Sequence, residues 1–305
     1  MRKGRVVLGV FAGLAALLAA GWFLSWPSPP FYELAGPVAL SAPVLTQEQY
    51  GAVHEQFARP YVVECSAGTG RVVLFGSAHT RDPNDPQLAE IERRFTELEP
   101  TVALVEGRPG APLAALRDPV AQFGEMGAVL ALGRRLGARI YSWEPSRAAE
   151  VAAQLERFPA ERVALYYVLR PYVSERRFGR PDDPDAKLEA TRGERTRWKG
   201  LEGTLPSVAA VDELWHRDFA GLPDWRDTSD ERGWPGYLQE IANASNEIRD
   251  EHFARVVIDL LTRGERVFAV AGSSHSVKLE PALLAACGES FAGTLASDGR
   301  RLPPG

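Results

Sequence analysis

The chain has 305 residues, of which 45% are hydrophobic and 25% are charged, a composition typical of a globular protein rather than a disordered one. Its formal net charge of −5 argues against a nucleic-acid-binding protein, which normally carries a basic surface. The length allows one large domain or two smaller ones.

The first 26 residues predict an N-terminal transmembrane helix. Three basic residues among the first five precede an uncharged run over residues 6–26, which is long enough to cross a bilayer. Basic flanks stay on the cytoplasmic side, so we expect the rest of the chain in the periplasm or at the cell surface. A cleavable signal peptide is the alternative. We favour an uncleaved anchor because the run ends in large residues, with Trp22 and Trp26 suited to the membrane interface.

A linker and one large domain are expected after the anchor. Residues 27–45 are rich in proline and lack apolar periodicity, which is typical of a spacer. Residues 46–305 predict a single α/β domain with a mostly parallel central sheet flanked by helices. Cys65 and Cys287 could form a disulfide in an oxidising compartment or could be two separate core residues, and the sequence leaves both open.

Strands and helices alternate along the predicted domain. Two β-rich runs, 61–65 and 71–75, are separated by five residues with two glycines and predict an N-terminal hairpin. Later runs with strand character cover residues 101–105, 138–143, 266–271 and 290–295. Runs with helical periodicity cover residues 46–57, 87–98, 111–116, 120–136, 147–158, 161–173, 206–219, 241–262 and 279–286. The polar segment 174–203 predicts a solvated loop or a lid over a site.

The motif Gly-Ser-x-His occurs twice, at residues 76–79 and 272–275, each time directly after a predicted strand. Glycine lets the backbone turn tightly at the end of a strand, and His79 and His275 then lie at the edge of the sheet. Two intervening strands are followed by carboxylates, Glu106 and Glu144. Parallel strands share one carboxyl edge, where α/β proteins bind ligands, so we expect all four side chains there.

Two imidazoles and one or two carboxylates suit a divalent metal such as Zn, Mn or Co that activates water for hydrolysis. We expect His79, His275 and Glu106 to be metal ligands and a remaining glutamate, such as Glu144, to move protons. Without a metal, one histidine could itself be the general base. A purely structural role for the motifs is the alternative. Their serines are not expected to be nucleophiles, because neither lies in a Gly-x-Ser-x-Gly motif.

One helix is expected to present polar groups next to its apolar stripe. In the run 241–262, the spacing puts Arg249 and Asp250 on one face with Asn246 and Phe253. Polar groups at such a place can point into a cleft.

This layout resembles the TraB/GumN/Tiki superfamily, which also groups erythromycin esterase-like and ChaN-like proteins. Its marks are two Gly-x-x-His motifs at opposite ends of the domain, a glutamate after the second strand and an arginine on the helix before the second motif. Here Glu106 and Arg249 match the glutamate and the arginine. The stretch around Arg249 is similar to the Arg-Asp-x-x-Met-Ala of esterase-like members, with Phe253 in place of Met. The resemblance spans residues 61–287.

The resemblance implies an α/β fold with His79, His275, Glu106 and Arg249 in one cleft. Tiki proteins look like metal-dependent proteases, erythromycin esterases open a lactone with activated water, and ChaN-like proteins bind haem. We therefore expect a membrane-anchored hydrolase that acts on a peptide or on a small-molecule ester or amide. Arg249 would stabilise the developing oxyanion or hold a substrate carboxylate. A haem- or ligand-binding protein without turnover and a degenerate interaction domain are the alternatives.

Overall fold

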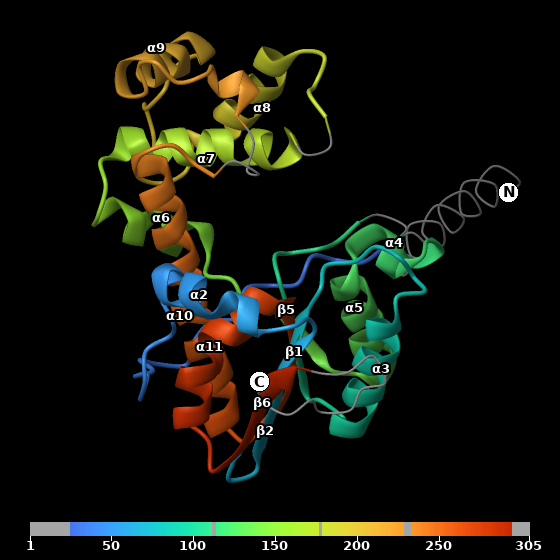
Figure 1. Ribbon diagram of the computed structural model, residues 1–305. Coiled ribbons are helices and arrows are strands. Elements are labelled where there is room, and N and C mark those ends of the chain that lie inside the picture. The colour runs from blue at the N-terminus through green and yellow to red at the C-terminus, as the bar shows by residue number, and fades with distance from the viewer. Residues whose placement is uncertain (1–24, 112–113, 177–178, 229–232, 295–305) are drawn as a thin grey trace, which may run out of the picture. The chain divides into compact units, whose positions relative to one another are not determined.

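The chain divides into two compact units in the computed structural model (Figure 1). The sheet unit comprises residues 1–144 and 250–305, and the helical unit comprises residues 145–249. This division differs from the single domain predicted over residues 46–305. The structure describes residues 25–111, 114–176, 179–228 and 233–294.

Six strands form the sheet, in the spatial order β4-β3-β5-β2-β1-β6. Their bounds are Tyr61–Ala67 for β1, Gly70–Ser77 for β2, Val102–Val105 for β3, Arg139–Ser142 for β4, Arg266–Gly272 for β5 and Glu289–Thr294 for β6. Strands β4, β3, β5 and β2 are parallel neighbours, whereas β1 pairs antiparallel with β2 and with β6. The predicted mostly parallel sheet and N-terminal hairpin are confirmed.

The four parallel strands end at one edge of the sheet. In spatial order, the chain after these strands leads to Glu144, Glu106, His275 and His79. Strands β2 and β5 pair in register up to Ser77 and Gly272, so both Gly-Ser-x-His motifs leave neighbouring strands at the same level. The sheet therefore brings together the four chain positions that the sequence pattern singled out.

Helices cover both faces of the sheet (Figure 1). In the sheet unit they are α2 over Gln47–Val53, α3 over Pro86–Leu98, α4 over Pro119–Phe123, α5 over Glu125–Leu136, α11 over Ser273–Ala285 and the second part of α10, which spans Tyr237–Thr262. Successive strand residues point to opposite faces. Phe75 accordingly packs in the core beneath α3 and α5, and Leu74 packs in the core beneath α10 and α11.

Local sequence sets where the helices that flank the first motif begin and end. Helix α3 starts at Pro86 behind the N-cap Asp85, whose side chain accepts a hydrogen bond from the backbone N–H of Gln87. Helices α4 and α5 were predicted as one helix over residues 120–136. They are separated by Gly124, which has a φ of 64°.

Residues 27–45, predicted to be a free linker, pack on the sheet unit. The backbone N–H of Tyr32 donates to the carbonyl of Ser142 (3.0 Å), and the N–H of Ser142 donates to the carbonyl of Pro30 (2.8 Å). The Tyr32 hydroxyl donates to Asp259 of α10 (2.6 Å). This segment therefore runs beside β4, at the outer edge of the sheet.

The predicted anchor over residues 1–26 lies outside the described residues except for its last two. Trp26 exchanges two backbone hydrogen bonds with Ala111 (3.0 and 3.1 Å) and stacks on Phe123, with ring centroids 6.2 Å apart. Its expected position at a membrane interface stays a prediction. Within the described ranges, no helix combines the length and the apolar character needed to span a bilayer.

Cys65 and Cys287 form a disulfide, which decides between the two possibilities left open by the sequence. Their Cα atoms are 5.6 Å apart, and the bond connects positions 222 residues apart in the chain. It links β1 to the segment between α11 and β6. The disulfide thus joins the two chain segments that make up the sheet unit, residues 1–144 and residues 250–305.

The helical unit has its own core. Its helices are α6 over Arg147–Leu155, α7 over Ala160–Glu175, α8 over Pro184–Arg195, α9 over Val208–Asp218 and the first part of α10. Trp215, Trp225 and Tyr172 are among its buried side chains. The polar loop predicted over residues 174–203 is wrong in part, because α8 lies there with Asp183 as its N-cap and Leu188 buried.

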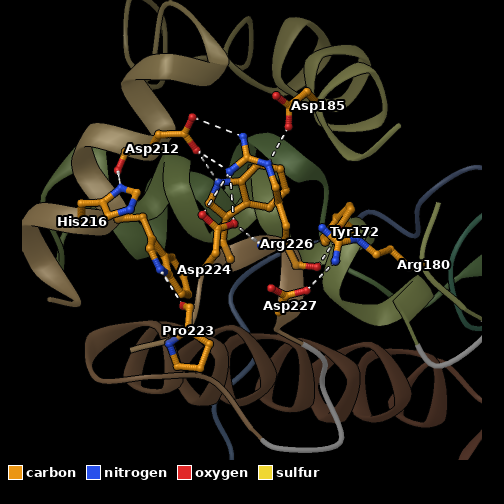
Figure 2. A network of polar contacts seen from close by, with 11 residues as sticks. Tyr172, Arg180, Asp185, Asp212, His216, Pro223, Asp224, Arg226 and Asp227 are labelled. Carbon is orange, nitrogen blue, oxygen red and sulfur yellow. Dashed lines mark hydrogen bonds and ion pairs between the residues drawn. The ribbon is translucent and has the colours of Figure 1, made fainter. Parts of the chain in front are cut away.

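Arg226 is the centre of a polar network in the helical unit (Figure 2). Its guanidinium donates to Asp185 (2.6 Å), Asp212 (2.9 Å) and Asp224 (3.1 Å) and lies over the ring of Trp225. Asp185 is on α8 and Asp212 is on α9, so this one cation connects two helices. We interpret the network as structural.

Candidate functional site

The two Gly-Ser-x-His motifs hold each other at the carboxyl edge of β2 and β5. The single proton of the Ser273 hydroxyl is shared between the carbonyl oxygens of Gly76 and Ser77, both at 2.9 Å. The single proton of the Ser77 hydroxyl is shared between the carbonyl of Ala271 (3.1 Å) and a carboxylate oxygen of Glu125 (2.9 Å). Both serines are buried. Their hydroxyls therefore join the two motifs, and the expectation that neither is a nucleophile stays a prediction.

The glycines of the motifs are explained by space rather than by backbone conformation. Gly76 is a paired residue of β2, Gly272 has φ −61° and ψ 146°, and neither adopts a positive φ. A Cβ at Gly76 would lie 2.6 Å from the carbonyl oxygen of Tyr61 and 2.5 Å from Oγ of Ser276. A Cβ at Gly272 would lie 2.9 Å from Nε2 of His79. The prediction that these glycines allow a tight turn is therefore wrong. Glycine is needed at both positions because neighbouring groups approach the backbone too closely for a side chain.

The imidazole of His79 is held by Glu125, the first residue of α5. Nδ1 of His79 donates to Oε1 of Glu125 (2.7 Å), which also accepts from the hydroxyl of Ser77 (2.9 Å). The other oxygen of Glu125 accepts from the backbone N–H of Thr80 (3.3 Å). The carboxylate side chain is 3% exposed, whereas the imidazole is 66% exposed. A buried carboxylate thus fixes a ring that solvent can reach.

This pairing changes the proton affinity of both groups. The hydrogen bond to Glu125 raises the pKa of His79 although burial lowers it, and the charges of Glu125 and Glu106 raise it further. Burial alone would raise the pKa of Glu125, but the hydrogen bonds from His79 and Ser77 hold this pKa below its usual value. Glu125 is therefore an ionised acceptor at neutral pH, which makes Nδ1 of His79 the protonated ring nitrogen and leaves Nε2 as the acceptor in the neutral ring.

Gln87 fixes the backbone of the first motif between its serine and its histidine. The side-chain amide of Gln87 donates to the carbonyl of Ala78 (2.6 Å) and accepts from its backbone N–H (3.1 Å). Gln87 is in the first turn of α3 and is 7% exposed. Gln87 therefore holds both the N–H and the carbonyl of Ala78, which fixes the loop that carries His79.

His275 is held in the same way as His79, although its surroundings differ. It lies in the first turn of α11, which begins at Ser273 and not at residue 279 as predicted. Nδ1 of His275 donates to Asp250 of α10. Its ring makes a T-shaped contact with the ring of Trp143, with centroids 5.2 Å apart, and the Trp143 ring stacks on Phe253. Its side chain is only 12% exposed.

Asp250 has a second partner. Its Oδ2 lies 3.3 Å from Nζ of Lys278, which is also on α11. Nζ of Lys278 donates to Oε1 of Gln47 on α2 (2.8 Å). The Asp250 and Lys278 side chains are 1% and 4% exposed, so the ion pair is buried.

Three other predicted site residues have different positions. Glu106 follows β3 and is close enough to His79 for its charge to raise that pKa. A carboxylate oxygen of Glu144, which follows β4, lies 3.9 Å from the place of a Cβ at Gly107. Arg249 is buried and is the last residue of the helical unit, directly before Asp250. Its predicted role in the site stays a prediction.

The predicted metal ligands are not gathered into a binding cluster. Over the described part of the chain, no group of three His, Cys, Asp or Glu side chains is placed to hold a metal ion. His79, His275 and Glu106 are therefore not collected around one point, although both imidazoles have Nδ1 on a carboxylate, as metal-bound histidines usually do.

Glu125 and Asp250, the carboxylates that orient the two histidines, are not among the site residues predicted from the sequence. Asp250 was placed on the polar face of its helix with Arg249, which is a usable signal. Glu125 lies within an ordinary amphipathic helix, and its pattern gave no signal.

No family model, no curated protein and no solved structure matches this chain.

Proposed function

We propose that this protein is a hydrolase that cleaves an amide or ester bond by attack of water at the carboxyl edge of the sheet. The observation that carries the proposal is the matched pair of imidazoles, each with Nδ1 on a buried carboxylate. A carboxylate at Nδ1 fixes the ring and its tautomer, so that Nε2 can accept a proton. This is the arrangement that general-base catalysis needs.

His79 is the better candidate for the base because its ring is exposed to solvent. In the proposed step, Nε2 of His79 takes a proton from water while the water oxygen bonds to the carbonyl carbon. The tetrahedral intermediate then expels the amine or alcohol, which takes up a proton from the imidazolium. Glu125 would stabilise the imidazolium without taking its proton.

The substrate is proposed as a peptide or a small-molecule ester or amide, as the resemblance to the TraB/GumN/Tiki superfamily implies. Glu106 and Glu144 follow the neighbouring parallel strands and would supply further carboxylates at the same edge. The expected role of Arg249 in stabilising an oxyanion belongs to the same proposal.

Assistance by Zn, Mn or Co is a second form of the proposal. His79, His275 and Glu106 would be its ligands, and a bound metal would acidify water and polarise the carbonyl. The carboxylates on both Nδ1 atoms favour it, whereas the described side chains do not form a ligand cluster. Metal analysis separates the two forms: no divalent metal in the purified protein, and none lost in His79→Ala or His275→Ala, would exclude the metal.

Haem binding without turnover is the competing function, because an exposed imidazole such as His79 can ligate haem iron. It predicts a Soret band on haem titration that is lost in one histidine variant. A degenerate interaction domain predicts instead that neither histidine matters to any phenotype.

We propose a location outside the cytoplasm, with the chain anchored through residues 1–26. The disulfide between Cys65 and Cys287 supports this location because such bonds form and persist in oxidising compartments.

Hydrolysis is tested with the full-length protein and a panel of chromogenic peptides and esters. His79→Ala and His275→Ala are each expected to lower the rate by about 100-fold or more, the usual contribution of a general acid or base. The matched control is His54→Ala, since His54 lies exposed after α2 and its ring nitrogen Nδ1 bonds to the carbonyl of Gly51 in its own turn. Equal rates in all four proteins, or no hydrolysis of any substrate, would contradict the proposal.

A further inference from the structure

Two partly buried arginines of the helical unit, Arg226 and Arg195, have opposite surroundings. Arg226 donates to three aspartates (Figure 2). Arg195, the last residue of α8, donates from Nη1 to the backbone carbonyl of Tyr167 (2.5 Å), and its guanidinium lies 5.2 Å from the centre of the Trp198 ring. Among the described residues, no carboxylate forms an ion pair with Arg195. Side chains therefore compensate the charge of Arg226 but not that of Arg195.

Two further guanidinium groups lie near Arg195. The guanidinium of Arg147, the first residue of α6, lies over the same Trp198 ring, 5.1 Å from its centre. Arg170 of α7 lies over the ring of Tyr166, 5.9 Å from its centre, and is close enough for its charge to act on Arg195. Three different helices thus each bring one arginine to this place, and we call the three residues the arginine cluster.

The arginine cluster is electrostatically unfavourable by itself. Burial and the charge of Arg170 lower the pKa of Arg195 to about 10, Arg147 acts in the same direction, and Glu194 opposes them. Nε of Arg195 is also buried and has no hydrogen-bond partner among the described residues. Like charges repel each other, and a buried donor without an acceptor costs free energy. The cluster therefore has more donors and positive charge than its acceptors can compensate.

Two glutamates that flank the cluster in the chain have other partners. Glu150 accepts hydrogen bonds from two hydroxyl groups. Glu194 pairs with Arg147 (3.1 Å), and both of these side chains are exposed. Arg170 and Arg195 therefore carry two positive charges with which no carboxylate in the described part of the chain forms an ion pair.

We propose that Arg195, Arg170 and Arg147 form a binding site for a dianionic oxyanion of the phosphate class. The planar guanidinium matches the oxygens of a phosphate group, to which it can donate two parallel hydrogen bonds. A phosphate monoester carries about two negative charges near neutral pH, which equals the charge of the two arginines without a carboxylate partner. Arg147 is 63% exposed, so the ligand can enter from solvent.

The site differs from the carboxyl edge of the sheet in its residues and in its chemistry. All three arginines lie within residues 145–249, the helical unit, whereas the histidines lie in the sheet unit. Binding of a phosphate group here needs neither hydrolysis nor a metal. The proposal therefore stands or falls separately from the proposed hydrolytic step.

The test is isothermal titration calorimetry of the full-length protein with inorganic phosphate at low ionic strength, where salt screens the charges least. Acetate at the same ionic strength is the comparison, and phosphate should bind at least tenfold more tightly. Arg195→Met and Arg170→Met should each weaken phosphate binding by about tenfold to a hundredfold, because each removes hydrogen bonds between charged groups. Arg217→Met is the matched control, since Arg217 is an exposed cation of the same unit that pairs with Glu161 and Asp218. This variant should bind phosphate as the wild type does.

Arg170→Met keeps the test decisive if Arg195→Met does not fold. Arg195 donates to the backbone of α7, whereas the described contact of Arg170 is with the ring of Tyr166. The proposal is overturned if phosphate binds the wild type no more tightly than acetate, or if folded Arg170→Met binds phosphate as tightly as the wild type. Phenyl phosphate distinguishes the two sources of the group: binding as tight as that of phosphate supports a site for a phosphate monoester, and binding of inorganic phosphate alone supports a site for the free ion.

Discussion

Alanine at Gly272 should disturb one imidazole and little else. The new Cβ would lie 2.9 Å from Nε2 and 3.3 Å from Cε1 of His79, whereas ordinary contacts begin near 3.4 Å. The nearest atoms belong to an exposed side chain that can move. We therefore expect the ring to shift by about half an ångström, which is the shortfall of the closest contact.

This shift should cost activity rather than stability. A misplacement of 1 Å costs about 100-fold in rate, so half of that distance should cost about tenfold. Alanine is a poorer N-cap than glycine by up to about 1 kcal/mol. At the ordinary φ of −61°, it also stabilises by about 0.4–1 kcal/mol through the unfolded chain. The two terms offset, and the free energy of unfolding should change by less than about 1 kcal/mol.

Gly76→Ala is the matched comparison. Its Cβ would meet the carbonyl oxygen of Tyr61 at 2.6 Å, and this atom belongs to the backbone of β1 and cannot turn away. Overpacking of this kind costs about 1–3 kcal/mol. Urea denaturation should therefore separate the two variants clearly.

The assay combines urea denaturation, ¹⁵N signals of the histidine rings and hydrolysis rates. The reasoning is refuted if Gly272→Ala loses as much stability as Gly76→Ala, or if the His79 ring signals of Gly272→Ala match those of the wild type.

Three further predictions concern stability. Replacing Cys65 and Cys287 by serine should lower the free energy of unfolding by about 2–5 kcal/mol, measured by urea denaturation, because a long chain segment is no longer closed; reducing agent should then have no further effect. Glu125→Gln should lower the free energy of unfolding most between about pH 4.5 and pH 6.5. The lowered pKa of the Glu125 carboxylate stabilises the fold only above the ordinary glutamate value, and the raised pKa of His79 does so only below the ordinary histidine value. A loss of stability that does not depend on pH would contradict the pairing. Burial lowers the pKa of His252 to about 4, so between pH 6.5 and pH 4 the unfolded chain binds a proton on this ring that the folded chain does not. The free energy of unfolding of the wild type should therefore fall by up to about 3 kcal/mol over this range. His252→Gln should remove this fall, and the same pH profile of stability in both proteins would contradict the prediction.

The common edge of the parallel strands could be predicted from local patterns. The apolar runs before residues 76 and 272 have strand character, and alternation with helices predicts parallel neighbours. The structure has these strands side by side, with β3 and β4 beyond β5. Chain direction then brings the positions of both histidines and both predicted glutamates to one edge.

Other features depend on contacts between distant residues, which a single sequence does not carry. The glycines looked like turn residues, but the groups that exclude a side chain there are Tyr61, Ser276 and His79. Glu125 looked like any glutamate of an amphipathic helix, because its role comes from a ring 46 residues earlier in the chain.

Composition was misleading at two places. Residues 174–203 are strongly polar, and α8 forms there because Asp183 and Pro184 start a helix that buries Leu188. Proline in residues 27–45 prevents regular structure but does not prevent packing, and this segment lies along β4.

The central claim is that both histidines are held at Nδ1 by carboxylates and keep Nε2 free to accept a proton. It is tested most directly by ¹⁵N NMR of the ring nitrogens at a pH where both rings are neutral, with signals assigned from His79→Ala and His275→Ala. The account predicts that both rings carry their proton on Nδ1. A proton on Nε2 of either neutral ring would contradict it.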